Sequence, residues 1–330
     1  MHFRAFGKLG WNVSEISFGA WAIGGDMWGP QDDAESLRAL HRAIDLGVNF
    51  IDTAQGYGKG HSEELIGRLL HERKENLFIA TKVPPRPGLP WPPPEDADAR
   101  QFFPASYLIE QCEASLKRLQ RDYIDVYQFH TWATAFNEAE EWCEAMTKLK
   151  QQGKIRAVGV SVPDATPDNV IGSLALEKVD AVQVIYNLFE QYPRWNLLPV
   201  CQKLGIGVIV RVPLDESALT GKLTSSTMFP EGDVRRHYFR GRNLPAVLRR
   251  VEEIRKFKDD HYPAMSLAEL ALRYCLSHSA VSTVIPGIRS TAQAEQNTAP
   301  SDGRLFTTEE LSLMNRFAWR KDFWHVEVDG

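Results

Sequence analysis

The feature that most constrains the fold of this 330-residue chain is an eightfold alternation of short apolar runs with amphipathic segments. The runs are rich in Val, Ile and aromatic residues, most are too short to form helices, and they do not alternate cleanly with polar residues. Such runs are typical of parallel strands buried on both faces. They cover residues 16–18, 48–51, 77–80, 123–129, 155–160, 181–186, 206–210 and 281–285.

The segments between these runs have the spacing of helices. In residues 33–46, for example, Leu37, Leu40 and Ile44 recur on one helical face. The same pattern predicts helices over 63–70, 106–119, 138–150, 167–174, 195–204, 246–257 and 266–277. Three glycines stand between a predicted helix and the next strand, where a left-handed cap is needed: Gly47, Gly153 and Gly205.

Eight strands alternating with helices predict an α/β fold, a (β/α)8 TIM barrel formed by a single domain over residues 1–330. An open doubly wound sheet is the alternative, and the absence of a G-x-G-x-x-G motif after an early strand disfavours it. Residues 3–6 and 13–14 flank a glycine-bounded turn and predict an N-terminal β-hairpin that closes the barrel floor. Long loops follow the third and seventh strands, over residues 84–104 and 224–243.

The composition excludes several classes of protein. The 38 Lys and Arg residues against 43 Asp and Glu residues give a net charge of −5, without the basic stripe of a nucleic-acid binder. The four cysteines are far apart and form no CxxC pair, which favours reduced thiols over a zinc or disulfide framework. Neither a signal peptide nor an apolar run of membrane-spanning length is present, so we expect a cytoplasmic protein.

Polar or ionisable residues end seven successive strands of the predicted barrel. One such residue alone is ordinary, because there the chain meets water. Seven of them at one rim predict a common pocket, since barrel enzymes place their chemistry at the carboxyl ends of the strands. The residues are Asp52, Lys82, His130, Ser161, Gln183 with Asn187, Arg211, and Gly287 with Arg289.

The chemistry available at this rim favours carbonyl reduction. No metal-binding spacing and no Cys–His or G-x-S-x-G nucleophile is present. A neighbouring ammonium at Lys82 is expected to lower the pKa of Tyr57, while Asp52 orients Lys82. Tyr57 then protonates a carbonyl oxygen that His130 binds. The hydride must come from a nicotinamide or flavin, because side chains cannot supply it.

These residues resemble the aldo-keto reductase family over essentially the whole chain. The matching segments are RAFGKLG, NFIDTAQGYGKGHSEELIG, IATK, SLKRLQRDYIDVYQFH, GKIRAVGVS and VIPGIRSTAQAEQN. The resemblance implies a barrel that binds NADPH in an extended pose without a dinucleotide-binding domain. It therefore agrees with the missing glycine motif.

The resemblance also implies roles for individual residues. The catalytic tetrad would be Asp52, Tyr57, Lys82 and His130, with Tyr57 as proton donor and His130 marking a carbonyl-reducing member. Ser161, Gln183 and Asp52 would lie at the nicotinamide end of the cofactor with Trp21, and Pro213, Leu214 and Lys222 would lie along the pyrophosphate. Gly287, Arg289, Gln293 and Asn297 would clamp the adenosine phosphate. Arg289 favours NADP over NAD, because a guanidinium pairs well with a 2′-phosphate.

The sequence departs from the family pattern at the ends of two strands. Val162 follows Ser161 where Asn or Arg is common, and Arg211 stands where an aromatic residue usually stacks on the nicotinamide. We expect Arg211 to pack on that ring. Asp215 and Glu216 replace small polar residues near the pyrophosphate, so they should point away or latch over the cofactor through a basic residue such as Arg242.

The leading hypothesis is an NADPH-dependent reductase of aldehydes or ketones that acts on a small-molecule carbonyl, with no nucleic-acid or membrane partner. Its apolar substrate pocket would contain Trp21, Tyr57, Trp91, His130 and Trp132. A cofactor-sensing regulatory subunit with weak turnover is the alternative, and a lyase or isomerase on the same barrel is a third possibility. Specificity would lie in residues 84–104, residues 224–243 and the C-terminal tail, and the oligomeric state is left open.

Overall fold

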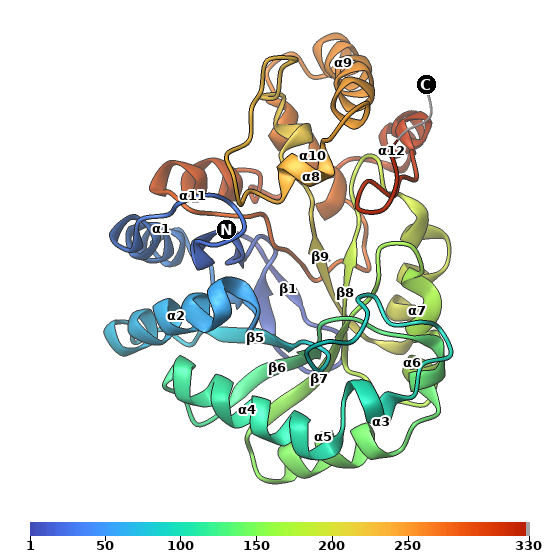
Figure 1. Cartoon of the computed structure of the whole chain (residues 1–330). Coiled ribbons are helices and arrows are strands. Elements are labelled where there is room, and N and C mark those ends of the chain that lie inside the picture. The colour runs from blue at the N-terminus through green and yellow to red at the C-terminus, as the bar shows by residue number, and fades with distance from the viewer. Residues whose placement is uncertain (328–330) are drawn as a thin grey trace.

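The central element of the protein is a closed barrel of parallel strands, seen in a computed structural model that describes residues 1–327 (Figure 1). Residues 328–330, which the single-domain prediction included, lie outside the described part. The strands are β3 (Phe18–Gly19), β4 (Phe50–Asp52), β5 (Phe78–Val83), β6 (Ile124–Phe129), β7 (Ile155–Ser161), β8 (Ala181–Ile185), β9 (Gly207–Arg211) and β10 (Thr283–Val284). Each strand pairs in parallel with the next in sequence. Parallel bridges from Ile16 to Val284 and from Gly19 to Gly287 close the ring, so the (β/α)8 prediction is confirmed.

Helices surround this barrel and cover its outer face (Figure 1). The helices that follow the strands are α1 (Asp33–Asp45), α2 (His61–Glu72), α4 (Ala105–Leu119), α5 (Glu141–Gln151), α6 (Ile171–Ala175), α7 (Leu197–Leu204), α10 (Leu267–Leu276) and α11 (Thr291–Thr298). Further helices lie in the loops and near the C-terminus: α3 (Ala99–Phe102), α8 (Arg235–Tyr238), α9 (Asn243–His261) and α12 (Thr308–Met314). Gly47, Gly153 and Gly205 all have positive φ, as a helix-to-strand cap requires. No helix within residues 1–327 is long and apolar enough to cross a membrane.

A small hairpin closes the bottom of the barrel, as the sequence predicts. Strands β1 (Phe3–Ala5) and β2 (Asn12–Ser14) pair in antiparallel fashion. Beyond β1, the fully buried Phe6 ring lies 5.5 Å from the Phe50 ring inside the barrel. Gly207 is required where Phe6 enters, because a Cβ on it would come within 2.5 Å of the Phe6 ring. This plug leaves the opposite, C-terminal end of the barrel as the open one.

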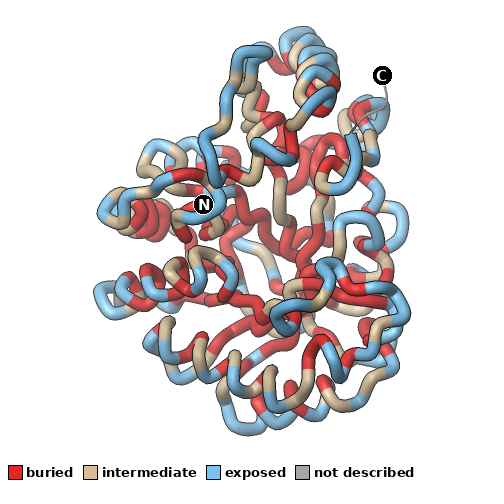
Figure 2. The backbone as a smooth tube through the Cα atoms, viewed as in Figure 1, coloured by how far each residue is buried: buried red, intermediate tan, exposed pale blue. Residues whose placement is uncertain are grey.

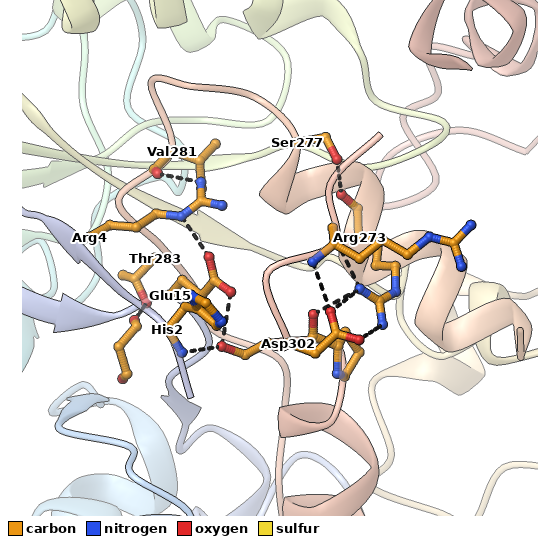
Figure 3. Close-up of polar contacts among 12 residues, drawn as sticks. His2, Arg4, Glu15, Arg273, Ser277, Val281, Thr283 and Asp302 are labelled. Carbon is orange, nitrogen blue, oxygen red and sulfur yellow. Dashed lines mark hydrogen bonds and ion pairs between the residues drawn. The ribbon is translucent and has the colours of Figure 1, made fainter. Parts of the chain in front are cut away.

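Polar contacts tie the hairpin to the last part of the chain (Figure 3). The Arg4 guanidinium donates to Glu15 at 2.8 Å and to the carbonyl oxygen of Val281 at 3.2 Å. Ser301 donates to the other Glu15 oxygen at 2.9 Å and accepts from the backbone N–H of His2 at 2.7 Å. These contacts fix the barrel floor, whereas the long loops gather at the other end.

Burial distinguishes the inside of the barrel from its outer surface (Figure 2). Buried segments fill the strands and the inner faces of the helices, and exposed ones lie on the outer faces and in the loops. One apolar cluster fills the lower barrel interior, and a larger one lies between the strands and the helices. The top of the barrel interior is different, because polar side chains from the strand ends occupy it.

Candidate active site

Three of the predicted catalytic residues lie together at the top of the barrel. Asp52 ends β4, Lys82 lies near the end of β5, and Tyr57 begins the short turn Tyr57–Gly60 after β4. The Lys82 ammonium donates to Asp52 Oδ2 at 2.6 Å, to the carbonyl oxygen of Thr53 at 2.8 Å and to Tyr57 Oη at 3.0 Å. An ammonium has three hydrogens to donate, so these contacts use all of them and fix it beside the phenol.

The Asp52 carboxylate is itself held by two amides. Its Oδ1 atom accepts from Gln183 Nε2 at 2.7 Å and from Gln128 Nε2 at 3.2 Å. Gln183 was expected at the nicotinamide, and here its amide orients the tetrad. Gln128 was not singled out from the sequence, although a polar residue inside a buried strand, two positions before His130, is a signal of this role.

The direction of the Tyr57 pKa shift corrects the sequence-based expectation. Burial raises the pKa of the Tyr57 phenol above its usual value, and the adjacent Lys82 ammonium offsets this only in part. Burial acts against the charged form of Lys82 as well, but Asp52 and Tyr57 keep its pKa above the usual range. Tyr57 is therefore a protonated acid at neutral pH, held beside a cation that would stabilise the phenolate.

His130 directly follows β6 and adds a neutral imidazole to the group. Burial, together with the charges of Lys82 and Arg211, lowers the pKa of His130 well below its usual value. Its ring centre lies 5.8 Å from that of Tyr57, edge to face, and its Nδ1 atom has no hydrogen-bond partner among residues 1–327. A neutral imidazole beside the phenol is suited to donate a hydrogen bond to a carbonyl oxygen.

A cavity of about 1290 Å³ opens above these residues. Asp52, Tyr57 and His130 line it, whereas Lys82 is fully buried behind them. Its walls also include every residue predicted to bind the cofactor: Trp21, Ser161, Gln183, Arg211, Pro213, Leu214, Lys222, Gly287, Arg289, Gln293 and Asn297. Pockets for small molecules typically enclose roughly 300–1,000 Å³, so this larger cavity has room for a dinucleotide and a substrate together.

The far end of the cavity fits an adenosine phosphate. A Cβ atom on Gly287 would meet nothing within 4 Å, so the backbone there borders open space. Arg289 lies just before helix α11 and donates to the carbonyl oxygen of Trp28 at 2.8 Å. Gln293 accepts from the backbone N–H of Arg289, and Asn297 donates to the carbonyl oxygen of Gly287. A fixed cation and an open backbone at a helix N-terminus are what a phosphate needs.

Arg211 is held by its own chain at the end of β9. Its guanidinium donates to the carbonyl oxygen of Val162 at 3.0 Å and to Asp164 at 2.6 Å. Both contacts lie in the loop after β7, and the Arg211 Nε atom has no partner among the described residues. The positive charge is thus largely neutralised at the cavity wall, and stacking of Arg211 on the nicotinamide stays a prediction.

Asp215 does not line the cavity, in agreement with the expectation that it points away, and no latch through Arg242 forms among the described residues. The buried Asp215 carboxylate instead accepts from Lys321 at 2.7 Å and from the Tyr238 hydroxyl at 3.3 Å. Glu216 lines the cavity, and burial beside Asp215 raises its pKa to about 8. A neutral Glu216 removes much of the repulsion that an acidic residue would exert on a phosphate.

The aromatic residues of the predicted substrate pocket divide into two groups. Trp21 stacks on Tyr57 with ring centres 5.8 Å apart, and Trp91 meets His130 edge to face at 4.9 Å. Trp132 was expected in the pocket, and this is wrong. It is fully buried behind the cavity, and its indole N–H donates to Asn137 at 3.1 Å. Its ring packs on other core aromatics: Phe129, Phe136 and Trp142.

The cavity wall also includes two C-terminal residues that the sequence did not single out. Trp324 and His325 of the C-terminal segment line the cavity. Within residues 1–327, no group of three or more His, Cys, Asp and Glu side chains is placed to hold a metal ion.

Comparison with known proteins points in one direction. The family model described as the aldo/keto reductase family matches residues 15–318. Aldo-keto reductase YhdN of Bacillus subtilis is 33% identical over 299 residues, which cover 89% of this chain and 87% of the relative. An NADH-specific methylglyoxal reductase of Escherichia coli is 30% identical over 315 residues, covering 93% and 95%.

A solved structure extends this similarity to three dimensions. It is an aldo/keto reductase from Klebsiella pneumoniae in complex with NADP and acetate, 25% identical to this chain. The two superpose with a TM-score of 0.69 over 98% of this chain and 99% of the other. The barrel, the loops and the C-terminal segment thus all have counterparts in a protein that binds a nicotinamide cofactor.

Proposed function

This chain belongs to the aldo/keto reductase family of oxidoreductases, and we propose that it reduces an aldehyde or ketone to an alcohol with NADPH. The observation that carries this proposal is the contact between Lys82 and Tyr57 on the wall of the cavity. A half-buried, protonated phenol held 3.0 Å from an ammonium is a proton donor whose conjugate base that ammonium stabilises in part. Family membership supports the nicotinamide as the source of the hydride.

Each of the four residues of the tetrad has its own role in protonating the carbonyl oxygen. A bound nicotinamide supplies the hydride that reaches the carbonyl carbon. Tyr57 gives its proton to the oxygen as negative charge develops there, and Lys82 stabilises the phenolate that remains. Asp52 holds Lys82 in place, and His130 donates a hydrogen bond that orients the carbonyl. The Tyr57 proton is then restored from water through the open cavity.

The cofactor preference rests on Arg289. Its guanidinium borders the open end of the cavity, where a 2′-phosphate would form charge-assisted hydrogen bonds with it. The NADP complex of the Klebsiella pneumoniae structure supports this choice, whereas the Escherichia coli relative is described as NADH-specific. Turnover with NADPH and NADH, measured side by side, decides between the two cofactors.

The substrate is proposed to be a small carbonyl compound with an apolar part, reduced in the cytoplasm. Trp21 and Trp91 flank Tyr57 and His130, and together they form an aromatic wall beside the proton donor. Such walls bind apolar surface while a few polar groups orient the ligand. The polar groups here are the Tyr57 hydroxyl and the His130 imidazole.

The test is NADPH consumption by the purified protein with a panel of aldehydes and ketones. The proposal predicts steady turnover in the wild type and its loss in Tyr57→Phe, which removes the proton and keeps the ring. A regulatory subunit would bind NADPH tightly and turn over poorly. A lyase or isomerase would form product without net consumption of NADPH, so the three functions give different results.

A further inference from the structure

A buried ion pair joins the C-terminal segment to the loop after β9, away from the catalytic tetrad. Lys321 lies in the segment 318–327, and only 3% of its side chain is exposed. Its ammonium lies 2.7 Å from Asp215 Oδ1 and 3.8 Å from Glu190 Oε1, and its backbone N–H donates to the same Glu190 oxygen. A buried cation with such partners is costly to leave unpaired, so this contact fixes where the segment lies.

The segment that Lys321 anchors forms one wall of the cavity. Asp322, Trp324 and His325 follow it directly and line the cavity. Arg240 donates to the carbonyl oxygen of Phe323 at 2.8 Å, and His237 is 2.8 Å from that of Trp324. These partners come from α8 and the turn after it, so they attach the segment at its sides. Lys321 attaches the segment to the loop after β9. Two other contacts join the segment to barrel loops, from Arg320 to the carbonyl oxygen of Ala165 and from the backbone N–H of Trp319 to that of Phe189.

The loop on the other side of the ion pair forms a neighbouring part of the cavity wall. Within Val212–Ser217, the residues that line the cavity are Val212, Pro213, Leu214, Glu216 and Ser217. Four of the loop residues hold positive φ without being glycine: Val212, Asp215, Glu216 and Ser217. Such a backbone is strained and persists only where its surroundings hold it in place. Asp215 sits in the middle of this stretch and receives the Lys321 ammonium.

We propose that Lys321 is a positioning residue that fixes two parts of the cavity wall relative to each other, the C-terminal segment 322–325 and the loop Val212–Ser217. Neither Lys321 nor Asp215 lines the cavity, so the pair acts through the segments that it joins. Without the ammonium, the buried Asp215 carboxylate loses its cation and the strained loop relaxes toward a different path. The C-terminal segment loses its fixed position at the same time. This inference rests on the proposed reductase function, because the positions of the two segments are measured through the binding of NADPH and of the carbonyl substrate.

The test compares Lys321→Met with Lys321→Arg, Asp215→Asn and the control Arg316→Met. Arg316 belongs to the same end of the chain and is exposed, so its replacement removes the same charge without touching either wall. The measurements are the NADPH dissociation constant, from fluorescence titration, and kcat and KM for an aldehyde that the wild type reduces. Thermal unfolding of each variant is recorded in parallel.

Lys321→Met is expected to weaken NADPH binding by about tenfold or more and to raise KM, because one partner of a buried charge pair has been removed. Its kcat at saturation should stay within about threefold, since the tetrad is untouched. Lys321→Arg should retain most of the binding, and Arg316→Met should match the wild type. In the double variant Asp215→Asn/Lys321→Met, binding should be no weaker than in Lys321→Met alone, as expected for two residues that act as a unit.

A purely structural role would lower the unfolding temperature of Lys321→Met and leave the dissociation constant and KM unchanged, and that result overturns the proposal. If Lys321→Met does not fold, Asp215→Asn decides, because Lys321 keeps Glu190 as its partner in that variant. A folded Asp215→Asn that binds NADPH like the wild type overturns the proposal as well. A wild type that neither binds NADPH nor reduces any carbonyl instead overturns the proposed function, so the two failures are distinct.

Discussion

The ammonium of Lys82 lies 3.0 Å from the hydroxyl oxygen of Tyr57, and Lys82 is fully buried behind the large cavity that the half-buried Tyr57 lines. A cation in this position changes what a phenol can do. The phenol stays protonated in the resting state, because burial raises its pKa more than the Lys82 charge lowers it. The Lys82 ammonium also stabilises the phenolate at the moment the proton leaves. The same pair therefore serves as a proton donor in reduction and, in reverse, as a proton acceptor in alcohol oxidation.

Replacing Lys82 by Met should lower kcat/KM by about 10²-fold to 10⁴-fold, the usual range for a lost acid–base contribution. The replacement also leaves the Asp52 carboxylate buried without its cation, which costs about 3–5 kcal/mol of the free energy of unfolding. Steady-state kinetics and urea unfolding of the same sample measure both effects. Lys82→Met/Asp52→Asn should recover stability without recovering activity. Recovery of activity would contradict the role given to the ammonium.

The pH profile of reduction should be flat across neutral pH. The acid form of Tyr57 is the active one, and its raised pKa keeps it protonated well above pH 7. The pKa of His130 lies well below its usual value, so its neutral form is also constant there. With NADPH saturating, so that ionisation of Glu216 does not limit cofactor binding, we expect kcat/KM for the carbonyl substrate to be level between about pH 6 and pH 9 and to fall above that range. Alcohol oxidation, which needs the phenolate, should rise with pH. A reduction rate that drops between pH 6 and pH 8 would contradict this assignment.

Arg289→Ala should weaken NADPH binding by about tenfold or more, because charge-assisted hydrogen bonds to a phosphate are lost. NADH lacks the 2′-phosphate, so its dissociation constant should change little. Titration of the wild type and the variant with both cofactors measures the difference. Equal losses for NADPH and NADH would show that Arg289 supports the loop through its contact with Trp28 and does not read the phosphate.

Trp132 and Trp91 form a matched pair that separates the core from the pocket. Trp132 is fully buried, whereas 52% of Trp91 is exposed beside His130. Trp132→Ala should lower the free energy of unfolding by about 3–5 kcal/mol. At a temperature where the variant stays folded, its KM should remain near that of the wild type. Trp91→Ala should raise KM and leave the unfolding free energy almost unchanged. The reverse pattern would restore Trp132 to the substrate pocket.

The barrel and three members of the site follow from local features of the sequence. Asp52, Lys82 and His130 each end an apolar run, and closure of a parallel barrel brings the ends of neighbouring strands together whatever the loops do. Gly47, Gly153 and Gly205 mark helix ends in the same local way. Such features depend on a few adjacent residues, so they can be read from the sequence alone.

The sequence-based predictions that the structure corrects concern properties that depend on distant parts of the chain. The pKa of Tyr57 rises because burial prevails over the Lys82 charge, and the extent of burial is set by loops that the sequence does not place. Trp132 lies in the core because Asn137 accepts from its indole N–H and other aromatic rings pack around it, Phe129, Phe136 and Trp142. The partner of Asp215 is Lys321, which is 106 residues away in the sequence. No local pattern specifies a contact of that kind.

The central claim is that Tyr57 delivers the proton in an NADPH-dependent carbonyl reduction. The most direct measurement is the single-turnover rate of NADPH oxidation with an aldehyde substrate, in the wild type and in Tyr57→Phe, with NADPH binding confirmed in both. We predict NADPH binding within about threefold of the wild type and a rate lower by about 10²-fold or more in Tyr57→Phe. A Tyr57→Phe variant that binds NADPH and oxidises it at the wild-type rate would contradict the account.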